Sequence, residues 1–191
     1  MNTYSLPTSI TVGDNDRKIR NDADYRVILA VIEILRDEEL SGYERIFLSL
    51  KTFYADGENA FKSSLVQEAY ERMCEFIDMC NYVEGATISK AEKKPISDFV
   101  QDFNLYVGAV NAVIGYDIRC DKTTHWFSFV AAYKEIDSKC TYSTILSIRD
   151  KIVHGEKLDK WESKYRHDNP WLFELRIWYT KDEWDFLHGE D

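Results

Sequence analysis

Apolar residues recur at helical spacing through most of this 191-residue chain. One such stripe starts with Tyr25, Ile28 and Leu29 and continues with Ile32 and Leu35. Residues three and four positions apart lie on one face of an α-helix, so the stripe predicts a helix with one buried face. The same spacing returns in nearly every later segment. The sequence therefore predicts a mainly α-helical fold, organised as a single multi-helix, bundle-like domain.

Polar residues and glycines next to these stripes predict where the helices begin and end. Ser41 and Glu44 match a capping box, in which a serine hydroxyl and a glutamate carboxylate each satisfy a free backbone N–H group. We expect Asn21 or Asp22 to cap the preceding helix, and Gly115 to end a later helix in the left-handed conformation. Further helices are expected after Ser97, after Thr123 or Thr124, after Thr141 or Ser143, from Phe61 to Cys80, and around Trp161 and Tyr165, with a loop over residues 82–94.

Two segments depart from the helical pattern. Residues 9–20 predict a short β-hairpin, because Ile10 and Val12 lead into a turn-forming run that starts at Gly13. Residues 170–191 form an acidic C-terminal extension rich in aromatic residues, which follows a helical domain of residues 1–169. Large aromatic side chains are unfavourable in water, so this tail either folds back onto the body or docks on a partner or a second copy. Trp171 and Trp178 are therefore candidate partner-binding residues.

The charge balance limits the kinds of partner that the chain can bind. Its 34 acidic and 24 basic residues give a formal net charge of −10. Proteins that hold nucleic acid through its phosphates need a basic surface, so this balance argues against such a role. The N-terminus has no signal-peptide pattern, and no apolar run approaches the roughly 20 residues that a membrane span needs. We expect a soluble, intracellular protein that binds neither nucleic acid nor membranes.

Arg149 and His154 form the sharpest candidate for catalysis. An arginine and a histidine separated by four residues on a helix are typical of HEPN ribonucleases, which are also all-α. In such an enzyme the histidine acts in acid–base chemistry and the arginine stabilises charge on the phosphate. The alternative is structural: Arg149 makes an ion pair, and His154 lies near a helix C-terminus, where positive charge is favourable.

His125 and Trp126 form a second candidate site. A histidine beside a tryptophan at a helix start is either a recognition point, with Phe129 one turn further on, or a core aromatic beside a hydrogen-bonded imidazole. A zinc site assembled with His125 has no support from the spacing of the cysteines, which are Cys74, Cys80, Cys120 and Cys140. We expect free thiols, no metal and no cofactor.

Short segments spread in one order over roughly residues 6–169 resemble a known family. They include Leu6-Pro7, Val12-Gly13, the run from Ile19 to Arg26, the run from Leu35 to Ser41, Phe53-Tyr54, Phe76-Ile77, Asp98-Phe99, Asp102, Tyr116-Asp117-Ile118, His125-Trp126 with Phe129, and the run from Ile145 to Arg149. The family comprises phage proteins encoded beside the tape-measure gene of long-tailed phages of Gram-positive bacteria, regarded as tail-assembly chaperones. Phe127 stands where the family usually has a second tryptophan, and His154 and the tail lie outside the shared pattern.

The resemblance implies a non-enzymatic role in phage tail assembly. A chaperone of this kind would bind the tape-measure protein in the host cytoplasm and keep it soluble. It would leave when tail-tube subunits polymerise, and would be absent from the mature virion. The resemblance also implies protein partners only: the tape-measure protein, tail-tube subunits and, as an open alternative, further copies of the chain. Two other functions stay open: a ribonuclease that uses Arg149 and His154, and an acidic inhibitor of a host defence protein.

Overall fold

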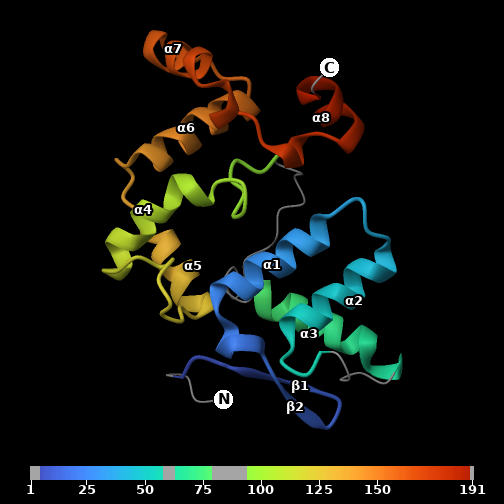
Figure 1. Ribbon diagram of the computed structural model, residues 1–191. Helices are drawn as coiled ribbons and strands as arrows, with labels where there is room; N and C mark the ends of the chain where they lie inside the picture. The colour runs from blue at the N-terminus through green and yellow to red at the C-terminus, as the bar shows by residue number, and fades with distance from the viewer. Residues whose placement is uncertain (1–4, 58–62, 79–93, 190–191) are drawn as a thin grey trace. The chain divides into compact units, whose positions relative to one another are not determined.

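The computed structural model describes residues 5–57, 63–78 and 94–189, and these are mostly helical (Figure 1). The helices are α1 (Tyr25–Arg36), α2 (Gly42–Phe53), α3 (Val66–Asp78), α4 (Phe103–Ile114), α5 (Trp126–Lys134), α6 (Thr141–Val153), α7 (Lys160–Asp168) and α8 (Lys181–His188). A hairpin of β1 (Ser9–Val12) and β2 (Asn15–Lys18) precedes them. The predicted fold class, mainly α with an N-terminal hairpin, is confirmed. The predicted loop over residues 82–94 lies almost wholly outside the described residues.

The backbone falls into two compact units. The first comprises residues 1–87 and 118–134, and the second comprises residues 88–117 and 135–191. The division between residues 1–169 and 170–191 that the sequence suggests stays a prediction.

In the first unit, α1 packs against α2 and α5, and α3 packs against α2 and the hairpin. The strands pair in antiparallel register from Ser9 opposite Lys18 to Val12 opposite Asn15. Ile28, Phe53 and Met73 are completely buried and contribute one core residue from each of α1, α2 and α3. The apolar stripes therefore face one another, as their spacing predicts.

The start of α1 differs from the prediction. Asn21 and Asp22 adopt left-handed backbone conformations with φ of 49° and 53°, so neither caps the helix. The N-cap is Asp24, whose carboxylate accepts the backbone N–H of Arg26 at 3.0 Å. The predicted capping box of α2 is confirmed, because Ser41 and Glu44 exchange the expected bonds.

In the second unit, α4 packs against α6, and the core includes Tyr106, Ile145 and Phe173. Gly115 ends α4 with φ of 86°, which confirms its predicted left-handed role. Ser97 does not start this helix. The Asp98 carboxylate accepts the N–H groups of the two residues after Phe99 and holds a turn there, so α4 starts only at Phe103.

Candidate partner-binding site

A buried ion pair joins α6 to the start of α4 in the second unit. Arg149 of α6 and Asp102, the N-cap residue of α4, are each 1% exposed. The guanidinium makes a two-pronged contact, with Nη1–Oδ2 at 2.7 Å and Nη2–Oδ1 at 2.9 Å. Its Nε donates to the Leu172 carbonyl at 2.7 Å, and Nη1 also donates to the Ile96 carbonyl at 3.1 Å. Arg149 thus ties three segments together: the loop before α4, the cap of α4 and the tail.

The same contacts bear on the predicted catalytic pair. His154 is an exposed residue at the C-cap of α6, where its Nδ1 lies 2.9 Å from the Asp150 carbonyl oxygen. The structure brings Arg149 together with Asp102 and shows no interaction between Arg149 and His154, both of which it describes. A phosphate would have to displace a buried carboxylate to reach this guanidinium. The geometry therefore matches the structural alternative for both residues.

The C-terminal tail folds back onto α4 and α6. Phe173 and Leu175 are buried, and the Leu172 carbonyl accepts the bond from Arg149. The Gln101 side chain donates to the Glu174 carbonyl at 2.8 Å and accepts the Arg176 N–H at 2.9 Å. Between the two open alternatives for the tail, the structure shows docking within its own unit.

Two of the predicted tail residues differ in their surroundings. Trp178 is partly buried, and its indole N–H donates to the Pro95 carbonyl at 2.6 Å. Trp171 is 65% exposed. Trp178 therefore anchors the tail, while Trp171 offers an indole to solvent.

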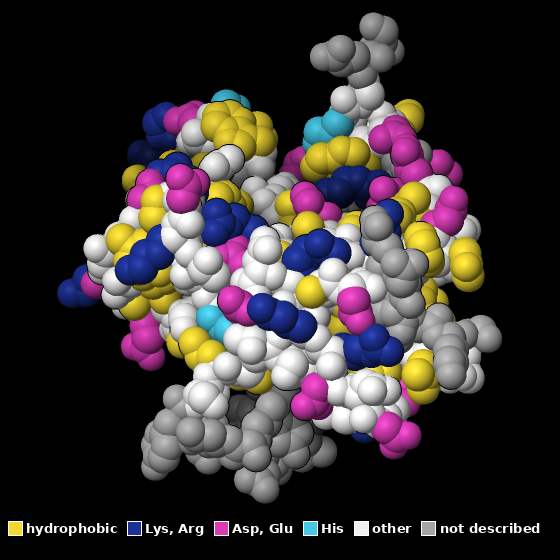
Figure 2. Space-filling view, turned by 60° about the horizontal axis from the view of Figure 1, so that its bottom comes forward, with side chains coloured by type: hydrophobic (Ala, Val, Ile, Leu, Met, Phe, Trp, Pro, Cys, Tyr) yellow, Lys and Arg dark blue, Asp and Glu magenta, His cyan; other side chains and the backbone are white. Residues whose placement is uncertain are grey.

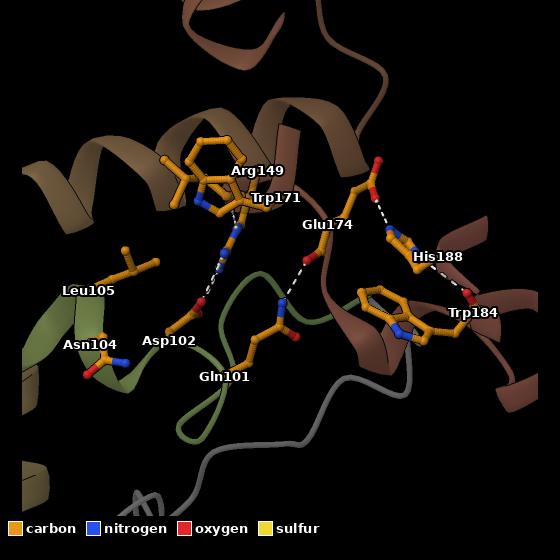
Figure 3. A pocket seen from close by; sticks show the side chains of 10 residues that line it. Gln101, Asp102, Asn104, Leu105, Arg149, Trp171, Glu174, Trp184 and His188 are labelled. Carbon is orange, nitrogen blue, oxygen red and sulfur yellow. Dashed lines mark hydrogen bonds and ion pairs between the residues drawn. The ribbon is translucent and has the colours of Figure 1, made fainter. Parts of the chain in front are cut away.

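The tail and α4 enclose a pocket of about 420 Å³, which Figure 3 shows from close by. Its lining residues come from both sides of the fold-back and are Gln101, Asp102, Asn104, Leu105, Arg149, Trp171, Leu172, Glu174, Trp184 and His188. The rings of Trp184 and His188 stack with their centroids 4.0 Å apart, and His188 Nε2 lies 3.0 Å from a Glu174 carboxylate oxygen. Apolar walls with a few polar groups are typical of ligand pockets.

His125, Trp126 and Phe129 occupy the core of the first unit. All three are buried, with exposures of 8%, 2% and 0%. Trp126 stacks on Phe129 at 5.6 Å, and its indole N–H donates to the Ile77 carbonyl. Phe129 in turn stacks on Tyr25 at 4.8 Å. A partner-binding role for these three stays a prediction, but their burial means that they act by holding helices in place.

Hydrogen bonds fix the orientation of the His125 ring. Nδ1 accepts the Phe127 N–H at 3.1 Å, so the proton of a neutral ring lies on Nε2, which donates to the Pro7 carbonyl at 2.9 Å. With both nitrogens engaged, the ring has no lone pair to offer zinc. Among the described residues no group of three or more His, Cys, Asp or Glu side chains is arranged to hold a metal. Cys74, Cys120 and Cys140 are free thiols, and Cys80 lies outside the described residues.

Asp24 connects this core to the start of α1. Its carboxylate accepts the Thr124 N–H at 2.9 Å and pairs with the Arg26 guanidinium at 2.7 Å. Burial alone would raise the pKa of Asp24, but the bonds from Arg26 and Thr124 favour the charged form more strongly, so the pKa is lowered. The carboxylate is thus a charged latch between segments 100 residues apart.

Four residues of the pocket and its floor, Asp102, Glu174, Trp184 and His188, were not singled out as site residues by the sequence. Asp102 belongs to the family pattern, but no spacing rule pairs it with Arg149, which lies 47 residues further on. Trp184 stood out only as one aromatic residue of the tail. A pattern of carboxylate and aromatic residues on both sides of Pro170 was the available signal.

These features define a helical protein whose clearest binding features are a pocket and exposed aromatic side chains. A family model described as Bacteriophage Gp15 protein matches residues 5–168. The match covers most of the chain, so the protein belongs to this bacteriophage family. No curated protein and no solved structure matches the chain. The matched region ends before the tail, so the tail half of the pocket lies outside it.

Proposed function

We propose that the protein is a non-enzymatic tail-assembly chaperone, which binds the tape-measure protein of a long-tailed phage and keeps it soluble. Membership of a bacteriophage family is the observation that carries this proposal. The likeness to chaperones encoded beside the tape-measure gene supplies the particular role. Binding would take place in the host cytoplasm and end when tail-tube subunits displace the chaperone.

Exposed aromatic side chains support a protein partner. In the first unit, Tyr43 and Phe47 stack one helical turn apart on α2 and are 77% and 47% exposed. In the second unit, Trp161, Trp171 and Phe186 are more than half exposed. Apolar side chains that stay in water at such positions mark interaction sites, and an amphipathic helix is a common occupant of surfaces of this kind.

The charge of the protein suits this role as well. On the face that Figure 2 shows, hydrophobic side chains lie among acidic and basic ones, and acidic residues outnumber basic ones over the whole chain. Net negative charge makes coated complexes repel one another and so keeps them in solution. No helix in the described part of the chain is long and apolar enough to cross a membrane.

Co-expression with the tape-measure protein tests the proposal. An affinity tag on this chain should recover the tape-measure protein, and Tyr43→Ser with Phe47→Ser, or Trp161→Ser with Trp171→Ser, should reduce the amount recovered without lowering the melting temperature. Glu135→Gln, at an exposed site, is the matched surface control. Failure of the wild-type chain to recover any tape-measure protein would overturn the proposal.

A further inference from the structure

We propose that the pocket of the second unit binds an arginine side chain that projects from the apolar face of a partner helix. This inference rests on the proposed function, because it names the chemistry by which the partner would be held. The pocket lies between the start of α4 and the tail, and three of its lining groups have binding capacity to spare: Trp171, Glu174 and Asn104 (Figure 3).

The indole of Trp171 offers an open aromatic face. Its ring is 65% exposed, and it neither stacks on another ring nor carries a cation among the described residues. Trp184 is different, because it stacks on His188 and has the Arg176 guanidinium 5.7 Å from its ring centre. Planar guanidinium groups stack on indole faces, with electrostatic attraction to the ring. Trp171 is therefore the wall against which an incoming guanidinium can lie.

The pocket also carries an acidic group without a strong cationic partner. Arg149 and Asp102 at its floor neutralise one another in a two-pronged pair. The Glu174 carboxylate is partly exposed and has one contact to His188, through Oε2, and no ion pair with a lysine or arginine that the structure describes. A carboxylate accepts several hydrogen bonds, so Glu174 can accept from a guanidinium as well as from the imidazole.

Asn104 completes the set. Its side chain is exposed on α4 and has no hydrogen bond to any residue in the described ranges. Its amide oxygen can accept an N–H that Glu174 does not bind. An aromatic face, a carboxylate and an amide oxygen together match a guanidinium better than an ammonium, because arginine has a flat shape and five donors. Leu105 and Leu172 add apolar lining for the aliphatic stem.

The geometry favours an arginine from a partner of opposite charge over one from a second copy. The chain has a net charge of −10, so two copies repel one another, whereas a basic side chain on a partner is attracted. A volume of about 420 Å³ accommodates one long side chain and not a whole helix. The helix itself would lie over the rim, against the exposed indole.

A peptide titration tests the pocket directly. The probe is a short amphipathic helical peptide with one arginine in its apolar stripe, and the control probe has citrulline, which keeps the shape but loses the charge. Nuclear magnetic resonance of the indole N–H groups reports the site. We expect the Trp171 and Trp184 signals to shift with the arginine peptide, while the Trp126 signal stays in place. The citrulline peptide should bind roughly tenfold more weakly.

Variants separate this pocket from other surfaces. Glu174→Gln and Asn104→Ala should each weaken binding of the arginine peptide severalfold, whereas Glu135→Gln should bind like the wild type. Equal affinity for both peptides, an unchanged Glu174→Gln variant, or shifts confined to Trp161 would overturn the proposal. A wild-type dimer that Glu174→Gln dissociates would also overturn it, because a second copy would then fill the pocket.

The two proposals fail in different ways. If the tape-measure protein co-purifies equally with the wild type and Glu174→Gln, the chaperone role stands and the arginine pocket does not. If the arginine peptide binds as expected but no form recovers the tape-measure protein, the pocket stands and the chaperone role falls.

Discussion

Replacing Arg149 with alanine should destabilise the second unit strongly. The guanidinium makes four hydrogen bonds, two of them to the Asp102 carboxylate, and both residues are 1% exposed. After the substitution, Asp102 would keep the Asp98 N–H at 3.0 Å but would lose its buried counter-charge. Breaking a buried pair from one side costs about 3–5 kcal/mol of unfolding free energy. At about 2–4 °C per kcal/mol, the melting temperature should fall by roughly 6–20 °C.

Urea unfolding followed by tryptophan fluorescence measures this effect where it arises, because four of the five tryptophans lie in the second unit. Arg149→Lys should lose less stability, since it keeps the charge without the two-pronged contact. Adding Asp102→Ala to Arg149→Ala should recover part of the loss by removing the orphaned carboxylate. His154→Ala is the control and should stay within about 0.5 kcal/mol of the wild type. An Arg149→Ala protein as stable as the His154→Ala protein would refute the reasoning.

Four further outcomes follow from other parts of the structure. The lowered pKa of Asp24 means that its carboxylate stabilises the fold fully above the pKa of the unfolded chain, about 3.9, and that this contribution is lost as pH falls through the folded value. The stability gap between wild type and Asp24→Asn should therefore be constant near neutral pH and should shrink in acid, as urea titrations at several pH values would show. Ser41→Ala should cost about 0.5–2 kcal/mol through loss of the capping box, whereas Ser41→Asn should keep most of it; calorimetry showing no difference between the two variants would count against the cap. Gly115→Ala should cost about 1–2 kcal/mol because φ is 86°, and a stabilised variant in thermal melts would contradict that assignment. Incubation with RNA should give no cleavage that depends on Arg149 and His154; cleavage by the wild type that a folded His154→Ala protein lacks would restore the ribonuclease alternative.

Local signals in the sequence predicted local structure well. The capping box at Ser41 and the left-handed Gly115 depend on residues within one helical turn, so the sequence alone was sufficient for both. The caps at Asn21 or Asp22 and at Ser97 were wrong for a related reason. Asp24 also bonds to Thr124, and a turn held by Asp98 delays α4, so tertiary contacts decided the boundary in the first case and a neighbouring residue did so in the second.

The site was harder to predict because its parts are distant in sequence. Arg149 stood out, but its partner Asp102 lies 47 residues away, and no spacing rule connects them. The pocket forms only when the tail folds back, which composition could not decide. Trp171 was predicted as a binding residue and is exposed, whereas Trp126 and Phe129 have the same aromatic character and are buried. Aromatic content indicated that surfaces exist, and only the fold separates surface from core.

The solubility of the tape-measure protein tests the central claim most directly. Purified tape-measure protein is diluted from denaturant into buffer with increasing amounts of this chain, and light scattering records its aggregation. We expect aggregation to fall to a plateau at a fixed ratio of the two proteins, with a soluble complex on size-exclusion chromatography. Equal aggregation with this chain and with an unrelated acidic protein would contradict the account.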